Sequence, residues 1–477
     1  MPNLEKFLAK NKSMIIAPAG YGKTHTIVEC VKLCTAEKKC LILTHTYAGI
    51  ASIRDKMKRE QVKCSKYLLE TISSFALQCM NAFHIDKSSI PNIEDDEYFN
   101  FAVDTAIRVL RSKPFKEVIK SSYSHLIVDE YQDCTQRHHK LILLLSNILP
   151  THIFGDPLQG IFGFKGEPLV DMESVEEVGG LNQNIDVLDT PWRWNNANAT
   201  ELGSALANIR SLLLRQEKID LSHYKNSIDT VIVTEKNYPL YLKTIRQKIN
   251  TSSTTSLLLI HPDAIRITSR LNIAKRCSPI RLIESIDHND FYEYAKQFDE
   301  MYGNDLIVSI LSFMKSITST TQIKNWFKDD CTLKSKRSDV DKKISKGLEL
   351  AITQLSRNKT SINIATLIEA IFHLPQNKCC RRELLSDILK SLRSSSVTGD
   401  TIYESMKKNR DIVRIYGRSV IGKCIGTTLL TKGLEFDTVI LLGAHKFKDP
   451  KNLYVALTRA SRKLIIITEN FVLSPYK

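Results

Sequence analysis

The chain has 477 residues, of which 43% are hydrophobic and 25% charged, the composition of a globular protein with about two to four domains. Its net charge of +15 favours a polyanionic partner, with nucleic acid as the first candidate and a generally basic surface as the alternative. The eleven cysteines lack the paired spacing of a zinc ribbon or a secreted disulfide scaffold, so reduced thiols are expected. No apolar run approaches the roughly 18–20 residues that span a bilayer, and the start has no signal-peptide core. We therefore expect no membrane segment and a cytoplasmic location.

A candidate phosphate-binding loop comes first, where residues 14–24 read MIIAPAGYGKT. An apolar strand leads into a loop that contains Gly20 and Gly22 and that ends in Lys23 and Thr24. Glycines let successive backbone N–H groups converge on an anion at the positive end of the next helix. Lys23 would reach the β- and γ-phosphates of a nucleotide, and the Thr24 hydroxyl would bind Mg²⁺. The full pattern asks for one more glycine where this chain has alanine.

Thr44 and Thr71 are candidate contacts to a nucleic-acid backbone. Residues 40–57 predict a strand, a threonine-rich turn and an amphipathic helix, and residues 69–77 place Thr71 just before another apolar stretch. Hydroxyl groups at the ends of strands commonly donate hydrogen bonds to phosphate oxygens. Helix capping is the alternative for either residue.

Two adjacent carboxylates follow a short apolar run in residues 123–135, YSHLIVDEYQDCT. Asp129 and Glu130 come directly after the run, with Gln132 and Asp133 close behind. The pattern predicts a buried strand that ends at the ligand-binding edge of an open α/β sheet. The two carboxylates repel each other, and a Mg²⁺ ion carrying nucleotide phosphates would neutralise them. A solvated acidic turn is the alternative, but together with the phosphate loop the pattern indicates a nucleoside triphosphatase.

Another strand and polar loop lie within residues 152–168, HIFGDPLQGIFGFKGEP. The amide of Gln159 could contact both a γ-phosphate and the attacking water, and so sense whether the nucleotide is intact. Phe162 and Phe164, next to Lys165, suit stacking on the bases of a single strand, worth roughly 1–3 kcal/mol per base. Ordinary core packing is the alternative for the two phenylalanines.

Two arginines further along the chain, Arg193 and Arg459, are candidates for contacts with a nucleotide phosphate. Arg193 lies between two tryptophans, which restricts its rotamers and suits a charge that points at a phosphate, and surface cation–π packing is the alternative. Residues 425–442 and 452–468 each predict a buried strand, and Arg459 lies in the second segment. A second domain that closes over the phosphate loop would bring such an arginine to the nucleotide, an effect worth about 10³–10⁵ in turnover. A solvated basic face is the alternative.

Taken together, these segments resemble superfamily 1 DNA helicases of the UvrD/Rep type. The matching segments stand in the family's order between residues 17 and 460 and are APAGYGKT, LTHTYAGIASIRDKM, TISSFAL, LIVDEYQD, FGDPLQGIFGFKG, LDTPWRW, TKGLEFDTVIL and LYVALTRA. The resemblance implies an α/β fold of two RecA-like parallel-sheet motor domains with reduced, mainly helical insertions. The implied boundaries are residues 1–57 and 116–187 for motor domain 1A, 58–115 for insertion 1B, 188–274 and 406–477 for motor domain 2A, and 275–405 for insertion 2B.

The resemblance also implies ATP and Mg²⁺ as cofactors and gives each candidate residue a role. Lys23 and Thr24 would bind phosphate and Mg²⁺, Asp129 would bind the metal, and Gly433 and Glu435 would contact phosphate and ribose. Glu130 would activate water, Gln159 would couple hydrolysis to DNA movement, and Arg193 and Arg459 would reach the γ-phosphate. Phe164 would stack on a DNA base. The chain also departs from the family. Residues 1–22 contain no Gln, the residue type with which the family reads adenine, and the strand-contacting positions near Thr44, Ser73 and Leu429 differ from the usual family residues.

Two hypotheses follow in which the protein is an active ATPase. The first is an ATPase that moves 3′ to 5′ on single-stranded DNA and unwinds tailed duplexes, in DNA repair or anti-phage defence. The second is a DNA-sensing ATPase subunit that regulates a partner nuclease and unwinds little by itself. A weaker resemblance to the helicase-like subunit of the Gabija anti-phage system, based on size and overall pattern, agrees with the second hypothesis. The intact Lys23, Glu130 and Arg459 argue against a non-catalytic DNA-binding scaffold.

Overall fold

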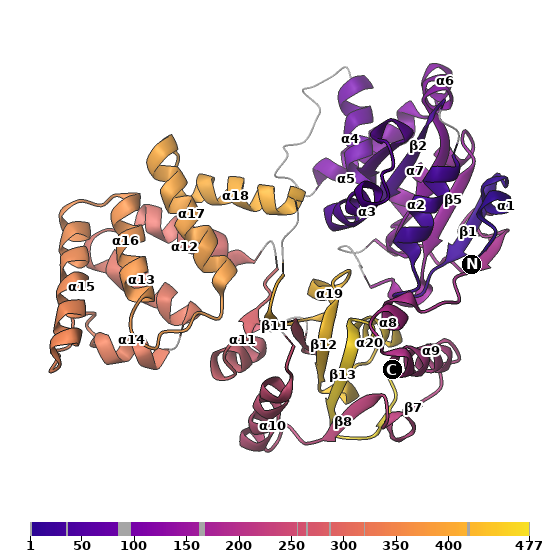
Figure 1. The fold of residues 1–477 in the computed structure, drawn as a ribbon. Helices are drawn as coiled ribbons and strands as arrows, with labels where there is room; N and C mark the ends of the chain where they lie inside the picture. The colour runs from indigo at the N-terminus through magenta and orange to yellow at the C-terminus, as the bar shows by residue number, and fades with distance from the viewer. Residues whose placement is uncertain are drawn as a thin grey trace. The chain divides into compact units, whose positions relative to one another are not determined.

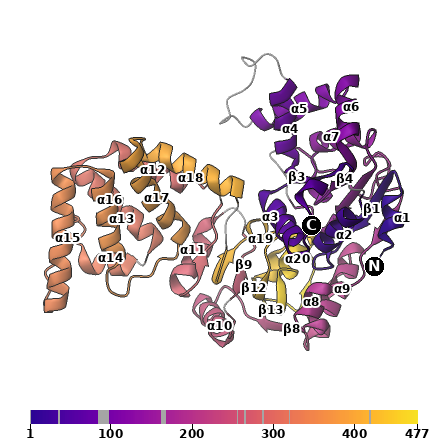
Figure 2. The same cartoon turned by 45° about the horizontal axis from the view of Figure 1, so that its top comes forward.

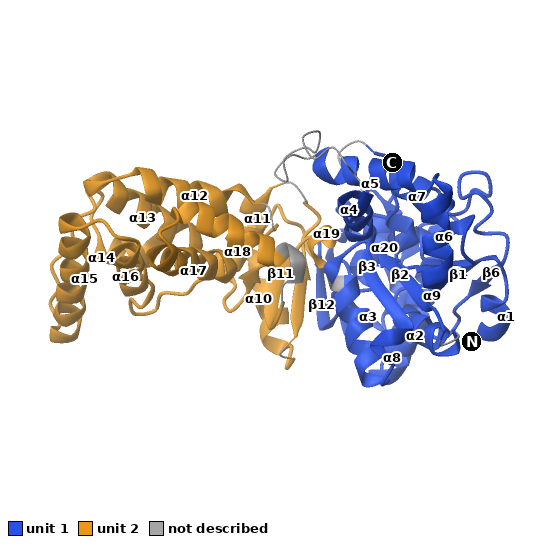
Figure 3. Cartoon of the chain, turned by 90° about the horizontal axis from the view of Figure 1, so that it is seen from above, with its two compact units in different colours: residues 1–232, 432–477 blue, residues 233–431 orange. Residues whose placement is uncertain are grey.

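A computed structural model describes most of the chain in two compact units (Figure 3). Unit 1 comprises residues 1–232 and 432–477, and unit 2 comprises residues 233–431. The described residues are 2–34, 37–83, 97–161, 167–254, 256–263, 266–285, 288–318, 320–416 and 420–476. In this part of the chain, no helix combines the length and the apolar character that a membrane span requires.

The first parallel sheet of unit 1 carries most of the candidate site. Its strands, in spatial order, are β3 (Tyr67–Thr71), β2 (Lys39–Thr44), β4 (Tyr123–Val128), β5 (Thr151–Gly155), β1 (Lys12–Ile16) and β6 (Ile185–Val187). The apolar runs of β1, β2, β4 and β5 are buried along most of their length, as expected for a parallel sheet that is covered on both faces. Because all pairings are parallel, the carboxyl ends of these strands meet at one edge.

Helices cover the first sheet and begin next to its strand ends. They are α1 (Leu4–Leu8), α2 (Lys23–Leu33), α3 (Tyr47–Arg59), α4 (Ile72–Phe83), α5 (Glu97–Val109), α6 (Lys113–Ser122) and α7 (Gln136–Ser146). Side-chain caps fix where several of them start, since Thr46 accepts from the Gly49 N–H and Thr135 accepts from the His138 N–H. Helices α4, α5 and α7 pack side by side (Figures 1 and 2) and bury their apolar faces in one core with β2 and β4.

Each unit also holds parallel strands outside the first sheet. Those in unit 1, in spatial order, are β12 (Phe436–Leu442), β13 (Ala460–Thr468) and β8 (Ile228–Ile232), and those in unit 2 are β10 (Arg281–Leu282), β11 (Lys423–Gly426) and β9 (Leu257–Ile260). Unit 1 also holds α8 (Trp192–Asn196), α9 (Thr200–Leu214), α20 (Pro450–Leu457) and the antiparallel pair of β7 (Ile219–Asp220) with β14 (Val472–Leu473). The buried strands predicted in residues 425–442 and 452–468 are β12 and β13.

Unit 2 is mainly helical. Its helices are α10 (Tyr238–Thr251), α11 (Ile267–Arg276), α12 (Asn289–Glu300), α13 (Gly303–Ile317), α14 (Thr320–Trp326), α15 (Asp339–Arg357), α16 (Ser361–Phe372), α17 (Arg382–Thr398), α18 (Ile402–Tyr416) and α19 (Thr428–Thr431). Helices α12, α13, α16 and α17 share one apolar core (Figure 2). Two buried arginines pin this bundle, because Arg381 pairs with Glu284 and Asp290, and Arg410 pairs with Asp387. The predicted α/β fold with parallel sheets and mainly helical insertions is confirmed.

Candidate nucleotide site

The phosphate loop joins β1 to α2 and depends on two glycines. Gly20 has a φ of +81° and Gly22 a φ of +90°, both in the left-handed region that favours glycine. The loop also packs tightly on α8, because a Cβ atom on Gly20 would lie 2.9 Å from the Cβ of Arg193 and one on Gly22 would lie 3.0 Å from the Cδ1 of Trp192. Backbone conformation and close packing therefore both require glycine at these two positions.

Ala17 occupies the position where the phosphate-loop pattern has glycine. Its backbone is not in the left-handed region, and its N–H donates a 2.8 Å hydrogen bond to the Gly155 carbonyl, which continues the pairing of β1 with β5. An alanine side chain is therefore compatible with this part of the loop, and the departure from the pattern leaves the strand–loop–helix geometry intact.

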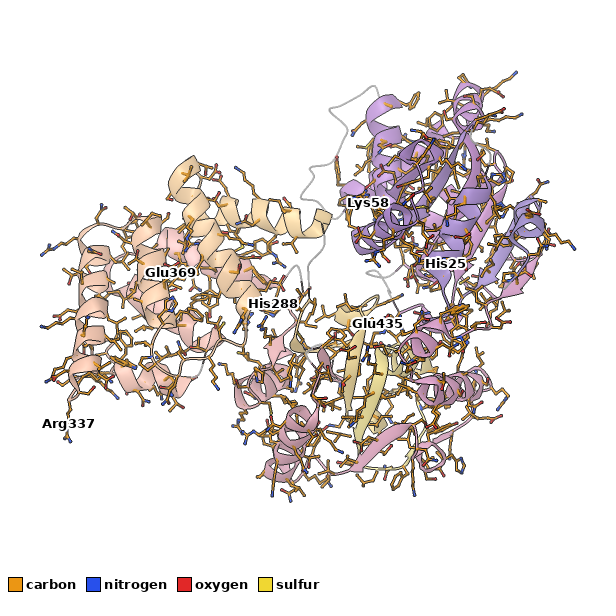
Figure 4. All side chains as sticks on the ribbon, in the orientation of Figure 1. His25, Lys58, His288, Arg337, Glu369 and Glu435 are labelled. Carbon is orange, nitrogen blue, oxygen red and sulfur yellow. The ribbon has the colours of Figure 1, made fainter. Side chains whose placement is uncertain are left out.

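Lys23 is the first residue of α2 and holds two carboxylates. Its Nζ lies 2.8 Å from Asp129 Oδ1 and also pairs with Glu130. Burial by itself lowers the pKa of Lys23, but the two neighbouring carboxylates outweigh it and raise the pKa above its ordinary value. Thr24 follows in the first turn of α2, and His25 comes next on the same helix (Figure 4). The structure thus brings the predicted phosphate lysine together with the predicted metal ligand and the predicted base.

Asp129 and Glu130 follow β4 in a strained turn. The Asp129 N–H donates to the Leu43 carbonyl at 2.8 Å, which anchors the turn to β2. Glu130 has a φ of +54°, in the left-handed region that a non-glycine residue rarely occupies, and its N–H donates to Asp129 Oδ1 at 2.8 Å. The Gln132 amide donates to the Glu130 carboxylate. These bonds hold both carboxylates in front of Lys23.

The two carboxylates have opposite pKa shifts. Burial, aided by repulsion from Glu130, raises the pKa of Asp129 although Lys23 opposes the shift. Burial also opposes ionisation of Glu130, but Lys23 and then Lys432 outweigh it and lower the pKa of Glu130 to about 2. Glu130 therefore stays ionised next to the two lysines. A base with so low a pKa abstracts protons poorly until one of those lysines moves away.

The residues at this edge fit a Mg²⁺ ion that arrives with a nucleotide. Within the described ranges, no three His, Cys, Asp or Glu side chains gather into a group that could hold a metal ion. Mg²⁺ needs only one or two protein carboxylates, because phosphate oxygens and water complete its octahedron. Asp129, together with the hydroxyl of Thr24 in the first turn of α2, would supply the protein ligands of such an ion.

Gln159 lies in a short helical turn, Pro157–Gln159, that follows β5. Its Nε2 donates to Asp156 Oδ2 at 2.9 Å, and the opposite oxygen, Oδ1, pairs with Arg210 at 2.7 Å. Gln132 Oε1 in turn accepts from the Asp156 N–H at 3.1 Å. Asp156 therefore connects the predicted coupling residue to Gln132, which in turn contacts Glu130. Arg210 was not among the predicted site residues.

Lys432 ties the segment before β12 to the same edge. Its Nζ lies 2.6 and 2.5 Å from the two oxygens of Asp133 and 2.5 Å from the Gln159 carbonyl oxygen. Burial raises the pKa of Asp133 to about 7 and lowers the pKa of Lys432, so burial works against this pair. The contact of one ammonium with both carboxylate oxygens is nevertheless that of an ion pair. It joins two residues that are 299 positions apart in the chain.

The two predicted arginines both donate to backbone carbonyls in or directly after α20. Arg193 donates to the Thr458 carbonyl at 2.6 Å, and its Nε lies 2.8 Å from Glu435 Oε2, although the two are not aligned as a hydrogen bond. Arg459 donates to the carbonyls of Val455 at 2.9 Å and Leu434 at 3.1 Å. Burial, followed by repulsion from Arg193, lowers the pKa of Arg459 to about 9. Glu435, labelled in Figure 4, is thus a partner of Arg193.

The remaining predicted residues lie in different surroundings. Gly433 has a φ of +81°, and a Cβ there would meet no atom within 4 Å. Thr44 ends β2 fully buried, and among the described side chains its hydroxyl has no hydrogen-bond partner. Thr71 ends β3 and accepts from the Ser74 N–H at 2.9 Å, which is the capping arrangement considered as the alternative. Phe162 and Phe164 lie outside the described residues.

Sequence comparisons place two family models on the chain. Residues 3–165 match a model described as an AAA domain, which covers the phosphate loop and the carboxylate turn. Residues 389–468 match a model described as a viral superfamily 1 RNA helicase core domain, which covers β11 to β13.

Three curated relatives extend these matches. Gabija protein GajB of Bacillus cereus (strain VD045) is 25% identical over 396 residues, which are 79% of this chain and 70% of that protein. An ATP-dependent helicase/nuclease protein of Lactococcus lactis subsp. cremoris (strain SK11) is 27% identical over 35% of this chain, and the exonuclease/helicase protein RexA of strain MG1363 is 26% identical over 35%. The chain spans only 14% of the length of either of these two proteins.

Among solved structures, the Pif1 helicase of Candida albicans aligns with 99% of this chain and 97% of its own, at a TM-score of 0.42 and 12% identity.

Proposed function

We propose that this chain is a superfamily 1, UvrD-like helicase of the DNA-dependent ATPase class, which hydrolyses ATP to move 3′ to 5′ along single-stranded DNA. One observation carries the proposal. Lys23, at the end of the phosphate loop, touches both Asp129 and Glu130 at the carboxyl end of β4. That is the set of groups that phosphoryl transfer to water needs, namely a phosphate cation, a metal ligand and a base.

Each residue has a proposed task at this edge. Gly20, Gly22 and Lys23 would bind the phosphates, and Thr24 with Asp129 would hold Mg²⁺, which neutralises phosphate charge when it is bound. Glu130 would take the proton of the attacking water while Gln159 orients that water. Arg193 and Arg459 would stabilise charge on the γ-phosphate, and Gly433 with Glu435 would contact phosphate and ribose. Phe162 and Phe164 would contact DNA, and Thr44 and Thr71, which are buried here, would do so only if the ends of β2 and β3 became exposed.

Nucleotide binding would have to change the partners of Lys23. Lys23 now neutralises the two carboxylates, and it cannot bind phosphate oxygens without loosening at least one of these contacts. Once Lys23 moves toward phosphate, the largest attraction that lowers the pKa of Glu130 weakens, so its pKa rises and it becomes a better base. The same exchange frees Asp129 to face a metal ion. Binding of substrate therefore activates the proposed base.

The domain assignment is part of the same proposal. Residues 1–57 and 116–187 would form the motor domain that binds phosphate and metal, residues 188–274 and 406–477 the motor domain that supplies the arginines, and residues 58–115 and 275–405 the reduced insertions. The ion pair of Lys432 with Asp133 supports movement of the two motor domains as coupled parts, because it links a residue of each. A cytoplasmic location is proposed with it.

A second candidate function is a DNA-sensing ATPase subunit that regulates a partner nuclease. The observation that favours it is the similarity to Gabija protein GajB, which extends over 79% of this chain. The helicase/nuclease names of the Lactococcus relatives point in the same direction. An anti-phage role fits this candidate, and in that case the chain alone would separate little duplex.

The test is steady-state ATP hydrolysis by the purified chain, with and without single-stranded DNA. Strong stimulation by DNA supports a motor, and unwinding of duplexes that carry either a 3′ or a 5′ tail then reports polarity. Preference for the 5′ tail would refute the proposed direction. DNA-stimulated hydrolysis without unwinding of either duplex would favour the nuclease-regulating subunit. A folded chain that binds nucleotide but hydrolyses none, with or without DNA, would refute the motor.

A further inference from the structure

The ion pair of Arg210 with Asp156 contacts Gln159 and has no role in the function proposed so far. Arg210, on α9, places its NH1 group 2.7 Å from Asp156 Oδ1. The Asp156 side chain is 1% exposed and that of Arg210 is 12% exposed, so water competes little for either charge. The Asp156 carboxylate accepts at both oxygens, since Oδ1 also accepts from the Leu158 N–H at 3.2 Å and Oδ2 accepts from Gln159. The orientation of this carboxylate is therefore fully specified.

The fixed carboxylate in turn decides how Gln159 presents its amide. Because Gln159 Nε2 donates to Asp156 at 2.9 Å, the donor end of the amide is engaged and turned inward. The acceptor end, Oε1, is then the end that can take a hydrogen bond from a water molecule. If Asp156 lost its partner Arg210, it could rotate, and the amide would lose the contact that selects its orientation. Arg210 thus acts on Gln159 through one intervening side chain.

Arg210 also reaches the phosphate loop by a separate route. Its guanidinium lies over the ring of Tyr454, 5.3 Å from the ring centroid, and the Tyr454 hydroxyl accepts a 3.3 Å hydrogen bond from the Ala19 N–H. Tyr454 belongs to α20 and is 2% exposed. A single buried guanidinium therefore touches both the side chain that orients Gln159 and the side chain that holds the backbone of the phosphate loop.

We propose that Arg210 is a positioning residue for ATP hydrolysis, which holds Asp156 so that Gln159 keeps its acceptor oxygen toward the attacking water. The inference rests on the proposed function, because it needs Gln159 to act on water. A planar guanidinium suits this task better than an ammonium, since it can bind a carboxylate along one edge while its face stacks on an aromatic ring. Arg210 touches neither substrate nor metal in this scheme and acts only through its neighbours.

The decisive experiment is a double-mutant cycle between Arg210 and Gln159 measured on kcat. If Arg210 acts through Gln159, Arg210→Met should lower kcat roughly 10- to 100-fold with KM for ATP within about twofold, because a misplaced catalytic group costs turnover more than binding. In a Gln159→Ala background, Arg210→Met should then cost much less in kcat than it does alone, and the remaining loss reports the separate contact with Tyr454. Independent losses that multiply in the double variant would overturn the proposal, as would a wild-type kcat for Arg210→Met.

Controls separate positioning from folding and from failure of the proposed function. Arg215→Met removes an arginine that caps the same helix but is 58% exposed and pairs with Glu217, and it should keep wild-type kcat. Stoichiometric binding of a fluorescent ATP analogue gives the folded, competent fraction of each variant. Should Arg210→Met fail to fold, Asp156→Asn, which preserves shape and removes the charge, must show the same dependence on Gln159. A wild-type chain without DNA-stimulated hydrolysis would overturn the function and this inference together, whereas an active wild type with an additive cycle would overturn only this inference.

Discussion

Replacing Glu130 by glutamine isolates the proposed base from the rest of the site. The substitution keeps the size of the side chain and an oxygen that can accept from Lys23 or from Gln132, so the turn after β4 should keep its form. It removes one negative charge and the group proposed to take a proton from water. Loss of a general base typically costs 10²–10⁴ in rate, about 3–5 kcal/mol of activation free energy.

The same substitution should leave nucleotide binding intact or strengthen it. Lys23 loses one of its two carboxylate partners and is held less firmly away from phosphate oxygens. Repulsion from Glu130 contributes to the raised pKa of Asp129, so without it the pKa of Asp129 falls and the ionised form that binds metal is favoured. Turnover and affinity should therefore move in opposite directions.

Two measurements on one preparation test this expectation. Hydrolysis with saturating single-stranded DNA gives kcat, and equilibrium titration with a fluorescent ATP analogue gives the dissociation constant. Glu29→Gln is a matched control, because Glu29 lies on α2 and pairs with Lys32 on the surface, away from the phosphate loop. Hydrolysis by Glu130→Gln at the wild-type rate would show that another group takes the proton. A parallel loss of binding would show that the substitution damages the site instead.

Three further predictions concern other parts of unit 1. Lys23→Ala should abolish nucleotide binding or turnover, because it removes the cation that binds phosphate and that separates the two repelling carboxylates of Asp129 and Glu130. Binding at wild-type affinity in the titration above would contradict the role of the phosphate loop. Phe164→Ala should reduce DNA-stimulated hydrolysis more than basal hydrolysis, and an equal loss of both would make it a packing residue. Burial, and then repulsion from His125, lowers the pKa of His152 to about 3. The neutral form of His152 therefore stabilises the fold fully above pH 6.5, the pKa of histidine in the unfolded chain. This stabilisation is lost as the pH falls from 6.5 toward 3, at up to about 1.4 kcal/mol per pH unit. His152→Asn should therefore flatten the fall in unfolding temperature between pH 7 and pH 5, and an unchanged slope would refute the assignment.

The sequence predicts the parts of the site that depend on strand ends. Lys23, Asp129 and Glu130 could be placed together because a phosphate loop and an apolar strand that ends in carboxylates must meet at the same edge of a parallel sheet. Arg210 and Lys432 could not be placed in this way, since their carboxylate partners are 54 and 299 positions away and the contacts depend on how helices and loops pack. A weak signal was present for Arg210, which directly follows Ile209, a buried apolar residue of α9.

Charge balance at the edge supports the proposal that a metal ion accompanies the nucleotide. Among the described residues of the site, ion pairs already engage the carboxylates and join Lys23 to Asp129 and Glu130, Arg193 to Glu435, Lys432 to Asp133 and Arg210 to Asp156. A triphosphate adds several negative charges to a buried region where unpaired charge is costly. If Lys23 turned to the phosphates, Asp129 would lose its cation, and a divalent ion held by Asp129 would supply the missing positive charge. Nucleotide without Mg²⁺ should for this reason bind weakly even though the phosphate loop is fully formed.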